Sequence, residues 1–556
     1  MINKDNIQDI SKLSPMQENI FFYGSLQPHS TAYHITTAYK ITGKLDVGKL
    51  QYAFKLLIQE HPVLRTVFTT LPTHGPLQVI LRNAKVNYNY IDHRQSLPED
   101  WHKVKESEKT HRFDLQKGPL VRLTIIQLSD LEWILLLAHH HIILDGWSSA
   151  LLIRKLADLY ISENIYDIQI NESSRNPFLQ YTRWVQKQDE LSTRTFWTNY
   201  LSSYENTLRL SDFANGNEED NSSARIIVSI LDSHQYESAK NICTSLQITM
   251  STFIKSAWAI TLCRLLKTSD IIFANVVTDR PSQISGIDNA LGLFINTVPV
   301  RFQQLKNQSL GQALTSFQAA ELQKTNHQYY STANIMSLSM QRNKLLDHAL
   351  IIENYELKAK QEQVVDVLSM QYIETEEKST YPFNIFFIPK EQIEIRIEFD
   401  PFIYDSDLMH QVLSCVLTTI CRMVKEPNAC MNELFLECDE CFTNIDTKVE
   451  KASAPITLPN QTIQKYKTGT ESELARLWQN VLNITQEIDR DDNFFEIGGT
   501  SINVIDLFLK LQQQVGKNCP SVSALYSNST LRKQAMLLEK NGGQQEVDRK
   551  TPLVEL

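Results

Sequence analysis

The sequence changes in character near residue 446. Residues 447–470 (TKVEKASAPITLPNQTIQKYKTGT) are polar, contain two prolines and have no sustained apolar period. Such a stretch is typical of a linker between units that fold separately. The 556-residue chain is therefore predicted to consist of a large N-terminal body and a small C-terminal unit. A flexible coil of about 24 residues would span roughly 25–30 Å.

The composition excludes several classes of protein. Hydrophobic residues make up 42% and charged residues 21% of the chain, with 16 glycines, which argues against collagen-like, low-complexity and disordered chains. The 54 basic and 64 acidic residues give a net charge of −10, so no global positive field attracts nucleic acid or anionic lipid. The start of the chain lacks an apolar segment after a basic one, and the apolar run at 133–138 is far shorter than a membrane span of about 18 residues. We expect a cytoplasmic protein that binds neither nucleic acid nor membrane.

The eight cysteines are irregularly spaced along a long chain, unlike those of a disulfide-stapled secreted domain. Cys438 and Cys441 form a C-x-x-C pair. The sequence has no second such pair and no histidine flanking it at zinc-ligand spacing. We interpret these cysteines as structural thiols and predict no metal site.

The N-terminal body alternates amphipathic helices with apolar strands, which predicts a mixed α/β fold. One helix is clearly indicated, because Asp46 can cap it, apolar residues from Val47 to Ile58 share one face, and His61-Pro62 ends it. Residues 64–68 follow as a predicted strand. Segments 120–128 and 132–141 are predicted to pair as a hairpin, and the second runs directly into a group of histidines.

The C-terminal unit carries three amphipathic stripes, at 474–482, 502–509 and 531–538. Ser529 is the predicted N-cap of the third helix. The pattern indicates a small helical bundle of about 70 residues, which is within the usual size of a domain. The residues after 540 are predicted to form a flexible tail.

The first chemical motif is the segment HHIILDG, from His140 to Gly146, which follows a predicted strand. A histidine carried by a strand into a turn can present its imidazole to a cleft, and its near-neutral pKa suits proton transfer. His139 extends the run to three histidines. Because consecutive strand residues face opposite sides, the three cannot all bind one metal ion without distortion. Taken alone, the motif leaves packed or surface histidines open as an alternative.

The second motif ends in Gly498-Gly499-Thr500-Ser501 at the start of an amphipathic segment. This placement exposes the Ser501 hydroxyl, and a helix N-terminus favours a phosphate attached there. The alternative is an N-cap serine that follows a glycine turn. Residues 471–496 contain seven acidic and two basic side chains, a local charge of −5. This charge could attract a basic modifying enzyme, and a solvated surface would explain it equally well.

Each motif is part of a longer segment that resembles a known protein family. The body resembles the condensation domains of nonribosomal peptide synthetases through a collinear series of segments over about 440 residues: SPMQE (14–18), EHPVLRTVF (60–68), HHIILDGWS (140–148), NPF to FW (176–197) and DRP to GLFINTVPVR (279–301). The segment DNFFEIGGTS (492–501) resembles the phosphopantetheine site of peptidyl carrier proteins.

The resemblance implies an α/β body of two chloramphenicol-acetyltransferase-like lobes in a V-shaped pseudo-dimer, with a tunnel open to one carrier domain on each side. We place the N-lobe at 1–175, the C-lobe at 176–446 and the linker at 447–470. An all-α four-helix carrier would then occupy 471–540, followed by the tail at 541–556.

The resemblance also assigns roles to residues. It places His141 at the centre of the tunnel with His140 beside it, and it makes Asp145 structural. We hypothesise that Asp145 pairs with Arg280, and that the Gly146 N–H could donate to a developing oxyanion. Further supporting residues of the site would be Trp147, Ser148 and Asn296.

In the carrier, the same likeness implies that Ser501 carries a covalent 4'-phosphopantetheine. Two positions depart from the family pattern. His139 stands where an apolar residue is usual, and Tyr329-Tyr330-Ser331 matches a later block only loosely. We predict that both positions tune substrate choice.

The implied activity is that of a carrier-dependent acyltransferase in nonribosomal peptide or hybrid polyketide–peptide biosynthesis, within antibiotic or other secondary metabolism. An amine held on a carrier would attack an acyl or peptidyl thioester and form an amide. An ester-forming reaction with a hydroxyl acceptor, transfer to a soluble acceptor, and a non-catalytic docking or gating body beside a working carrier remain alternatives. Epimerising and heterocyclising relatives fit less well, because the body precedes the carrier, Trp147-Ser148 follows Gly146 and the histidines are retained.

The short linker leaves no room for an adenylation domain between body and carrier. The expected partners are therefore an upstream acyl or peptidyl carrier protein as donor, an adenylation or other loading enzyme acting in trans, a phosphopantetheinyl transferase and a downstream assembly-line enzyme.

Overall fold

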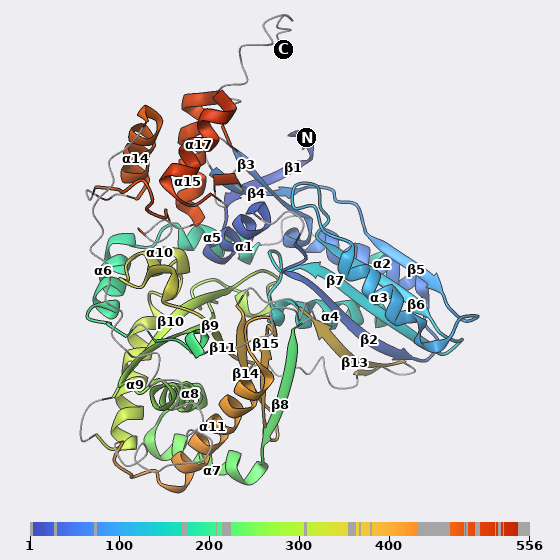
Figure 1. Ribbon diagram of the computed structural model, residues 1–556. Helices are drawn as coiled ribbons and strands as arrows, with labels where there is room; N and C mark the ends of the chain where they lie inside the picture. Colours follow the sequence, from blue (N-terminus) through green and yellow to red (C-terminus); the bar gives the residue numbers. More distant parts are fainter. Residues whose placement is uncertain are drawn as a thin grey trace, which may run out of the picture.

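The structure is a computed structural model that describes residues 4–26, 30–71, 75–168, 176–206, 208–213, 224–304, 308–353, 363–365, 368–377, 381–431, 468–482, 484, 487–494, 497, 501–516, 519–520, 524–525 and 528–542. Most of the predicted linker 447–470 and of the tail 541–556 lies outside these ranges, as does the predicted lobe boundary at residue 175. The fold comprises two α/β lobes and a helical unit (Figure 1).

The N-lobe is built on a six-stranded sheet. In spatial order its strands are β12 (Gln363–Val365), β13 (Leu368–Glu376), β2 (His34–Thr42), β7 (Glu132–His140), β6 (Val121–Gln127) and β5 (Tyr88–Asp92). Helices α2 (Val47–Glu60) and α4 (Gly146–Ile161) share a hydrophobic cluster with one face of this sheet, and α3 (Trp101–Thr110) shares a cluster with the other. Strand β7 is thus buried on both faces, which explains why its sequence is continuously apolar instead of alternating.

A small second sheet of β1 (Ile7–Lys12), β4 (Gly75–Leu81) and β3 (Thr66–Leu71) lies beside α1 (Pro15–Leu26) in the N-lobe (Figure 1). The 3₁₀ turns of the chain are short: η1 (Lys4–Asn6), η2 (Pro62–Arg65), η3 (Pro98–Asp100), η4 (Ile165–Asp167), η5 (Leu210–Phe213), η6 (Ile287–Asn289) and η7 (Arg342–Lys344).

The C-lobe is built on a second six-stranded sheet. Its order is β10 (Ile295–Gln303), β9 (Asp270–Thr278), β11 (Ala349–Ile352), β14 (Phe383–Pro389), β15 (Ile393–Phe399) and β8 (Arg225–Leu231). The main core of the lobe joins this sheet to α7 (Ser233–Leu246), α8 (Met250–Leu265), α9 (Leu310–Thr325) and α11 (Ser406–Lys425). A smaller cluster joins it to α6 (Glu190–Leu201) and α10 (Thr332–Ser337), while α5 (Pro177–Val185) packs toward the N-lobe.

The two lobes exchange segments. Strand β13 comes from the C-terminal half of the body but pairs with β2 in the N-lobe sheet. The segment 284–294 also places its apolar side chains in the N-lobe core. A single boundary at residue 175 therefore describes the chain order of the lobes but not their packing. These exchanges bring the ends of several strands together where the lobes meet.

Most local predictions for the N-lobe are confirmed. Helix α2 begins after Asp46, whose carboxylate accepts a 2.9 Å hydrogen bond from Lys49 N, and it ends at Glu60. Strands β6 and β7 form the predicted antiparallel hairpin. The strand predicted at 64–68 begins two residues later, at Thr66, because Pro62 starts the 3₁₀ turn η2, which includes Leu64 and Arg65.

The C-terminal unit contains three described helices, α14 (Gly469–Leu482), α15 (Ser501–Val515) and α17 (Leu531–Gly542). Residues 524–525 are also helical, and the rest of that segment is not described. The predicted cap of the third helix is wrong by one residue. Thr530, rather than Ser529, accepts a hydrogen bond from Lys533 N, while the Ser529 carbonyl accepts one from Phe494 N.

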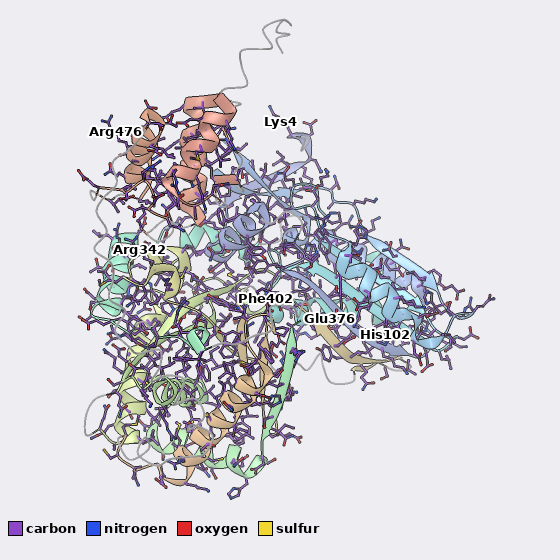
Figure 2. All side chains as sticks on the ribbon, viewed as in Figure 1. Lys4, His102, Arg342, Glu376, Phe402 and Arg476 are labelled. Atoms are coloured by element: carbon purple, nitrogen blue, oxygen red, sulfur yellow. The ribbon has the colours of Figure 1, made fainter. Side chains whose placement is uncertain are left out.

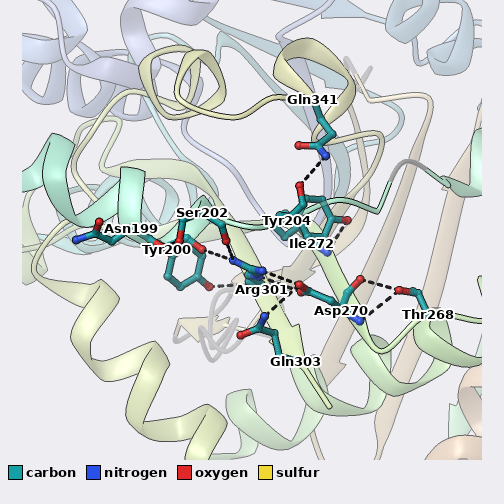
Figure 3. Close-up of polar contacts among 10 residues, drawn as sticks. All are labelled: Asn199, Tyr200, Ser202, Tyr204, Thr268, Asp270, Ile272, Arg301, Gln303 and Gln341. Carbon is teal, nitrogen blue, oxygen red and sulfur yellow. Dashed lines mark hydrogen bonds and ion pairs between the residues drawn. The ribbon is translucent and has the colours of Figure 1, made fainter. Parts of the chain in front are cut away.

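Arg301, the last residue of the GLFINTVPVR segment, connects three parts of the C-lobe (Figure 3). Its guanidinium makes two hydrogen bonds to Asp270 on β9, at 2.9 and 2.6 Å. It also donates to the carbonyls of Tyr200 and Ser202 at the end of α6. Arg301 thus has a structural role, fixing α6 against the β9–β10 edge of the sheet.

No helix among the described residues is long and apolar enough to cross a membrane.

Candidate active site

The histidine segment lies at the end of β7, in the middle of the N-lobe sheet. His140 is paired with His34 on β2, and its backbone N–H donates to Leu120 O. Its ring Nδ1 accepts a 3.2 Å hydrogen bond from Ile142 N. Burial is the main cause that holds the pKa of His140 well below its usual range, so this ring is neutral. His140 therefore shapes the turn that presents the next residue.

His141 follows directly after β7. Its backbone N–H donates to Tyr33 O at 2.8 Å, and the two rings meet edge to face with centroids 6.5 Å apart. The residue is 7% exposed, and its Nδ1 is buried without a hydrogen-bond partner. Its Nε2 lies 3.5 Å from a carboxylate oxygen of Glu377. Of the two ring nitrogens, Nε2 is thus the one that has a polar neighbour.

The prediction that His139 tunes substrate choice is contradicted by its position. The residue is fully buried, with both ring nitrogens unpartnered, and burial lowers its pKa to about 3. A neutral imidazole inside the core cannot touch a substrate. Within the described ranges, no group of three or more His, Cys, Asp or Glu side chains is arranged to hold a metal ion. Cys438 and Cys441 lie outside those ranges.

Asp145 joins the histidine turn to the C-terminal half of the body. Its Oδ1 caps α4 by accepting a 2.7 Å hydrogen bond from Ser148 N, and its Oδ2 accepts one of 2.9 Å from Phe294 N. Arg280 Nη2 lies 3.6 Å from Oδ1, as the pairing hypothesis predicts. Asp145 is 1% exposed, so it cannot react with a substrate. These contacts support the structural role predicted for Asp145.

The residues after Gly146 hold the same junction. The Ser148 hydroxyl accepts from Arg280 Nη2 at 2.9 Å and from Gly292 N at 3.1 Å, and it donates to Gly292 O. A Cβ at position 292 would clash with the rings of Phe178 and Phe294, so only glycine fits. Trp147 is 43% exposed and donates from Nε1 to Asp288 O. Gly146 itself is the exposed first residue of α4.

Asn296 organises a neighbouring loop on the C-lobe side. Its amide donates to the carbonyls of Gln328 and Tyr330 at 2.7 and 2.8 Å. Tyr329, in the loop that departs from the family pattern, is 6% exposed and hydrogen-bonded to Thr193. Asn296 therefore supports the site through the backbone, while a substrate-tuning role for the loop 329–331 stays a prediction.

Helix α1 connects the histidine turn to the C-terminal helical unit. Gln17 is fully buried, and its amide donates to Ile142 O in the HHIILDG segment at 3.1 Å. On the same helix, Phe22 is 3% exposed because it packs into the hydrophobic cluster of α14, α15 and α17. Helices α1 and α15 are in contact, and Figure 1 shows the helical unit seated over α1.

Ser501 is the first residue of α15. The backbone thus places it at the N-terminus of a 15-residue helix, where free N–H groups and the helix dipole favour a phosphate. This position fits the attachment of a phosphorylated group. The acidic side chains near it are partly used internally, since Glu471 is buried and forms a 2.8 Å ion pair with Arg490.

The sequence motifs did not indicate Tyr33 or Glu377. Tyr33 lies in a turn and has a left-handed backbone with φ of 65°, while Glu377 follows the last residue of β13. Neither belongs to a recognisable motif. Their proximity to His141 depends on the register of three strands, which the spacing of residues along the chain does not reveal.

The fold and these motifs define a class of protein: an α/β acyl-transfer body followed by a phosphopantetheine carrier. The family model for the condensation domain matches residues 7–440, and that for the phosphopantetheine attachment site matches residues 472–538. The chain belongs to the condensation-domain family. Condensation domains of nonribosomal peptide synthetases are acyl or peptidyl transferases that form amide bonds, and they work with carrier proteins in assembly lines. The second domain is the site of covalent 4'-phosphopantetheine attachment to a serine.

Several characterised proteins are similar to this chain. A plipastatin synthase subunit of Bacillus subtilis (strain 168) is 31% identical over 440 residues, covering 75% of this chain and 17% of the relative. Gramicidin S synthase 2 of Brevibacillus brevis is 27% identical over 421 residues, covering 74% and 9%. The chain thus spans a minor part of these relatives.

Among solved structures, a holo four-domain nonribosomal peptide synthetase bound to AMP and glycine superposes with a TM-score of 0.65. The identity is 17%, and the match covers 85% of this chain and 37% of that one. The first condensation domain of the calcium-dependent antibiotic synthetase gives a TM-score of 0.61 at 16% identity, covering 77% and 99%. These likenesses establish the two-lobed fold predicted from the sequence.

Proposed function

We propose that the body transfers an acyl or peptidyl group from an upstream carrier to an amine held on its own C-terminal carrier. His141 is the proton acceptor and Ser501 the attachment point. The observation that carries this proposal is the position of α1. This helix touches the histidine turn through Gln17 and the carrier through Phe22, so the carrier is seated against the element that supports the proposed catalytic turn.

The proposed chemistry requires one proton acceptor. An α-amine with an unperturbed pKa of roughly 7.7–8.0 is partly neutral at pH 7, so it can attack without prior deprotonation. Its nitrogen bonds to the thioester carbonyl carbon, and the nitrogen gives up a proton to His141 Nε2. The C–S bond breaks, and the departing thiolate takes that proton. A hydroxyl acceptor would need His141 as a general base before attack, because its own pKa is far higher.

The carrier residues fit the group that the family implies. When bound, 4'-phosphopantetheine supplies the thiol that holds the acceptor. Ser501 at the start of α15 would hold the phosphate end, where the helix N-terminus stabilises negative charge. The proposed partners are a phosphopantetheinyl transferase, a loading enzyme acting in trans, an upstream donor carrier and a downstream assembly-line enzyme.

Intact-protein mass spectrometry tests the proposal. The purified chain is converted with a phosphopantetheinyl transferase and a synthetic aminoacyl coenzyme A, then mixed with an acyl-loaded carrier. We expect an added acyl mass on the chain and an amide in the product released from it. A Ser501→Ala variant should remain unloaded. Acyl transfer to free amine by this variant at the wild-type rate would instead support a soluble acceptor.

His141→Ala separates the two kinds of acceptor. We expect at least a tenfold loss of amide formation and a larger loss of ester formation, because general acid–base groups contribute about 100- to 10,000-fold when deprotonation is required. His234→Ala, an exposed histidine on α7, is the matched control. Loading without any transfer in the wild-type chain, for every acceptor tried, would favour a docking body beside a working carrier.

A further inference from the structure

Glu377 brings a carboxylate to the proposed proton acceptor. Its Oε1 lies 3.5 Å from His141 Nε2. The Glu377 side chain is 43% exposed and that of His141 is 9% exposed, so an exposed carboxylate contacts a buried imidazole. Among the described residues, His141 is the one ion-pair partner of Glu377. No motif in the sequence points to this acid.

Strand register fixes the approach. In the N-lobe sheet, Glu376 on β13 is opposite Thr36 on β2, and Thr36 is opposite Ala138 on β7. Strands β13 and β7 both run antiparallel to β2, so they are parallel to each other. Their C-terminal ends therefore lie at the same edge of the sheet, on either side of the start of β2. Glu377, which follows β13, and His141, which follows β7, thus both emerge at this edge.

The end of β13 is anchored independently of His141. Lys105 on α3 binds Glu374 and Glu376 at 2.5 and 2.8 Å, and Lys109 binds Glu376 at 2.6 Å. Figure 2 labels Glu376 near the centre of the molecule, where the lobes meet. Because these ion pairs hold the strand end, Glu377 is positioned before any substrate arrives.

The other titratable groups around His141 leave Glu377 as its charge partner. His139 and His140 on β7 are neutral, because burial lowers the pKa of each. The ring of Tyr33 contacts the ring of His141. Tyr381 lies near Tyr33, and burial raises the pKa of Tyr381, so Tyr381 is also neutral.

On the C-lobe side, Glu398 of β15 lies close enough to Glu377 to feel its charge. Burial raises the pKa of Glu398, Arg396 opposes this rise, and Glu377 and Glu353 add to it. A buried carboxyl whose pKa is raised in this way favours its neutral form. Glu377, rather than Glu398, is the carboxyl group that lies against His141.

We infer that Glu377 acts through His141: the charge of its carboxylate, 3.5 Å from Nε2, stabilises the imidazolium that forms when the attacking nucleophile gives up its proton to that nitrogen. The inference rests on the proposed condensation reaction. Glu377 takes no proton and forms no covalent bond in this step. Its effect is electrostatic, because a nearby negative charge favours the protonated form of a histidine.

Glu377→Gln is the central test, with the holo chain and an acyl-loaded donor carrier. We expect about a tenfold lower kcat and a KM for the donor carrier within twofold of wild type. The acid limb of the pH–rate profile should move to lower pH, because a carboxylate close to a histidine favours its protonated form. Glu377→Asp should restore part of the rate and keep the wild-type acid limb.

Glu391→Gln is the matched control, since Glu391 is an exposed carboxylate in the turn between β14 and β15 and forms none of the ion pairs that hold the end of β13. Its acid limb should match that of wild type. A Glu377→Gln enzyme with an unchanged acid limb, or one whose loss is entirely in KM, would overturn the inference.

A second measurement does not depend on turnover. In the full chain with labelled histidine, NMR identifies the His141 ring by its absence in His141→Asn. Glu377→Gln should shift this resonance and Glu391→Gln should not. An unshifted His141 resonance in Glu377→Gln refutes the contact. Absence of product from the wild-type enzyme, together with a shifted resonance, would instead count against the proposed function alone.

Discussion

Replacing Asp145 with asparagine probes the junction that holds the histidine turn. Asparagine can still accept the hydrogen bond from Ser148 N through its single carbonyl oxygen. Its amide group would then face Phe294 N–H, a donor where Asp145 Oδ2 now accepts. The substitution also removes the charge that faces Arg280 at 3.6 Å. Both losses occur at a site that is 1% exposed.

The size of the effect follows from these contacts. A buried N–H left without an acceptor costs about 1–3 kcal/mol. Breaking a buried ion pair from one side costs about 3–5 kcal/mol. Arg280 keeps hydrogen bonds to Ser148 and to Ala290 O, and the two losses overlap, so they do not add fully. We expect a local destabilisation of about 3 kcal/mol.

Hydrogen exchange with mass spectrometry measures the stability of individual segments. A local measurement is needed because a chain with several domains does not unfold in one step. At about 1.4 kcal/mol per factor of ten, peptides covering 142–150 and 287–296 should lose roughly 100-fold in protection. Asp158→Asn, an exposed acid on the same helix α4, should change little. Equal protection of both peptides in Asp145→Asn and wild type would refute the structural role of this carboxylate.

Three further predictions follow from single contacts. Burial raises the pKa of Asp279 from 3.8 to about 6, so the folded state loses stability as pH rises through this range. In urea unfolding, the stability of Asp279→Asn relative to wild type should be higher at pH 8 than at pH 5 by about 1.4 kcal/mol. An equal difference at both pH values would contradict this. Arg301→Gln removes the bidentate pair with Asp270 and should lower the free energy of unfolding of the C-lobe by about 2–3 kcal/mol. The expected result is a lower melting temperature, and an unchanged melting temperature would contradict this. Phe22→Ser should release the carrier from α1. The NMR lines of the carrier helices should then become narrower while their chemical shifts otherwise stay unchanged. Lines as broad as in wild type would refute this docking contact.

Local structure was well determined by the sequence. Hydrogen bonds and apolar periodicities between residues close together in the chain determine these features, so the sequence predicts them directly. They include the Asp46 cap, the apolar face of α2, the β6–β7 hairpin and the three carrier helices. The errors in local structure were small and had local causes. Pro62 delayed a strand by two residues, and Thr530 replaced Ser529 as a cap.

Contacts between residues far apart in the chain became known only from the tertiary structure. Strand β13 joined the sheet of the other lobe, Phe22 entered the carrier core, and Glu377 reached His141. His139, which the sequence placed near the proposed proton acceptor, is fully buried in the core. Sequence periodicity specifies which face of an element is apolar, but not which distant element covers that face or in what register. Those choices depend on packing and on strand pairing across the whole chain.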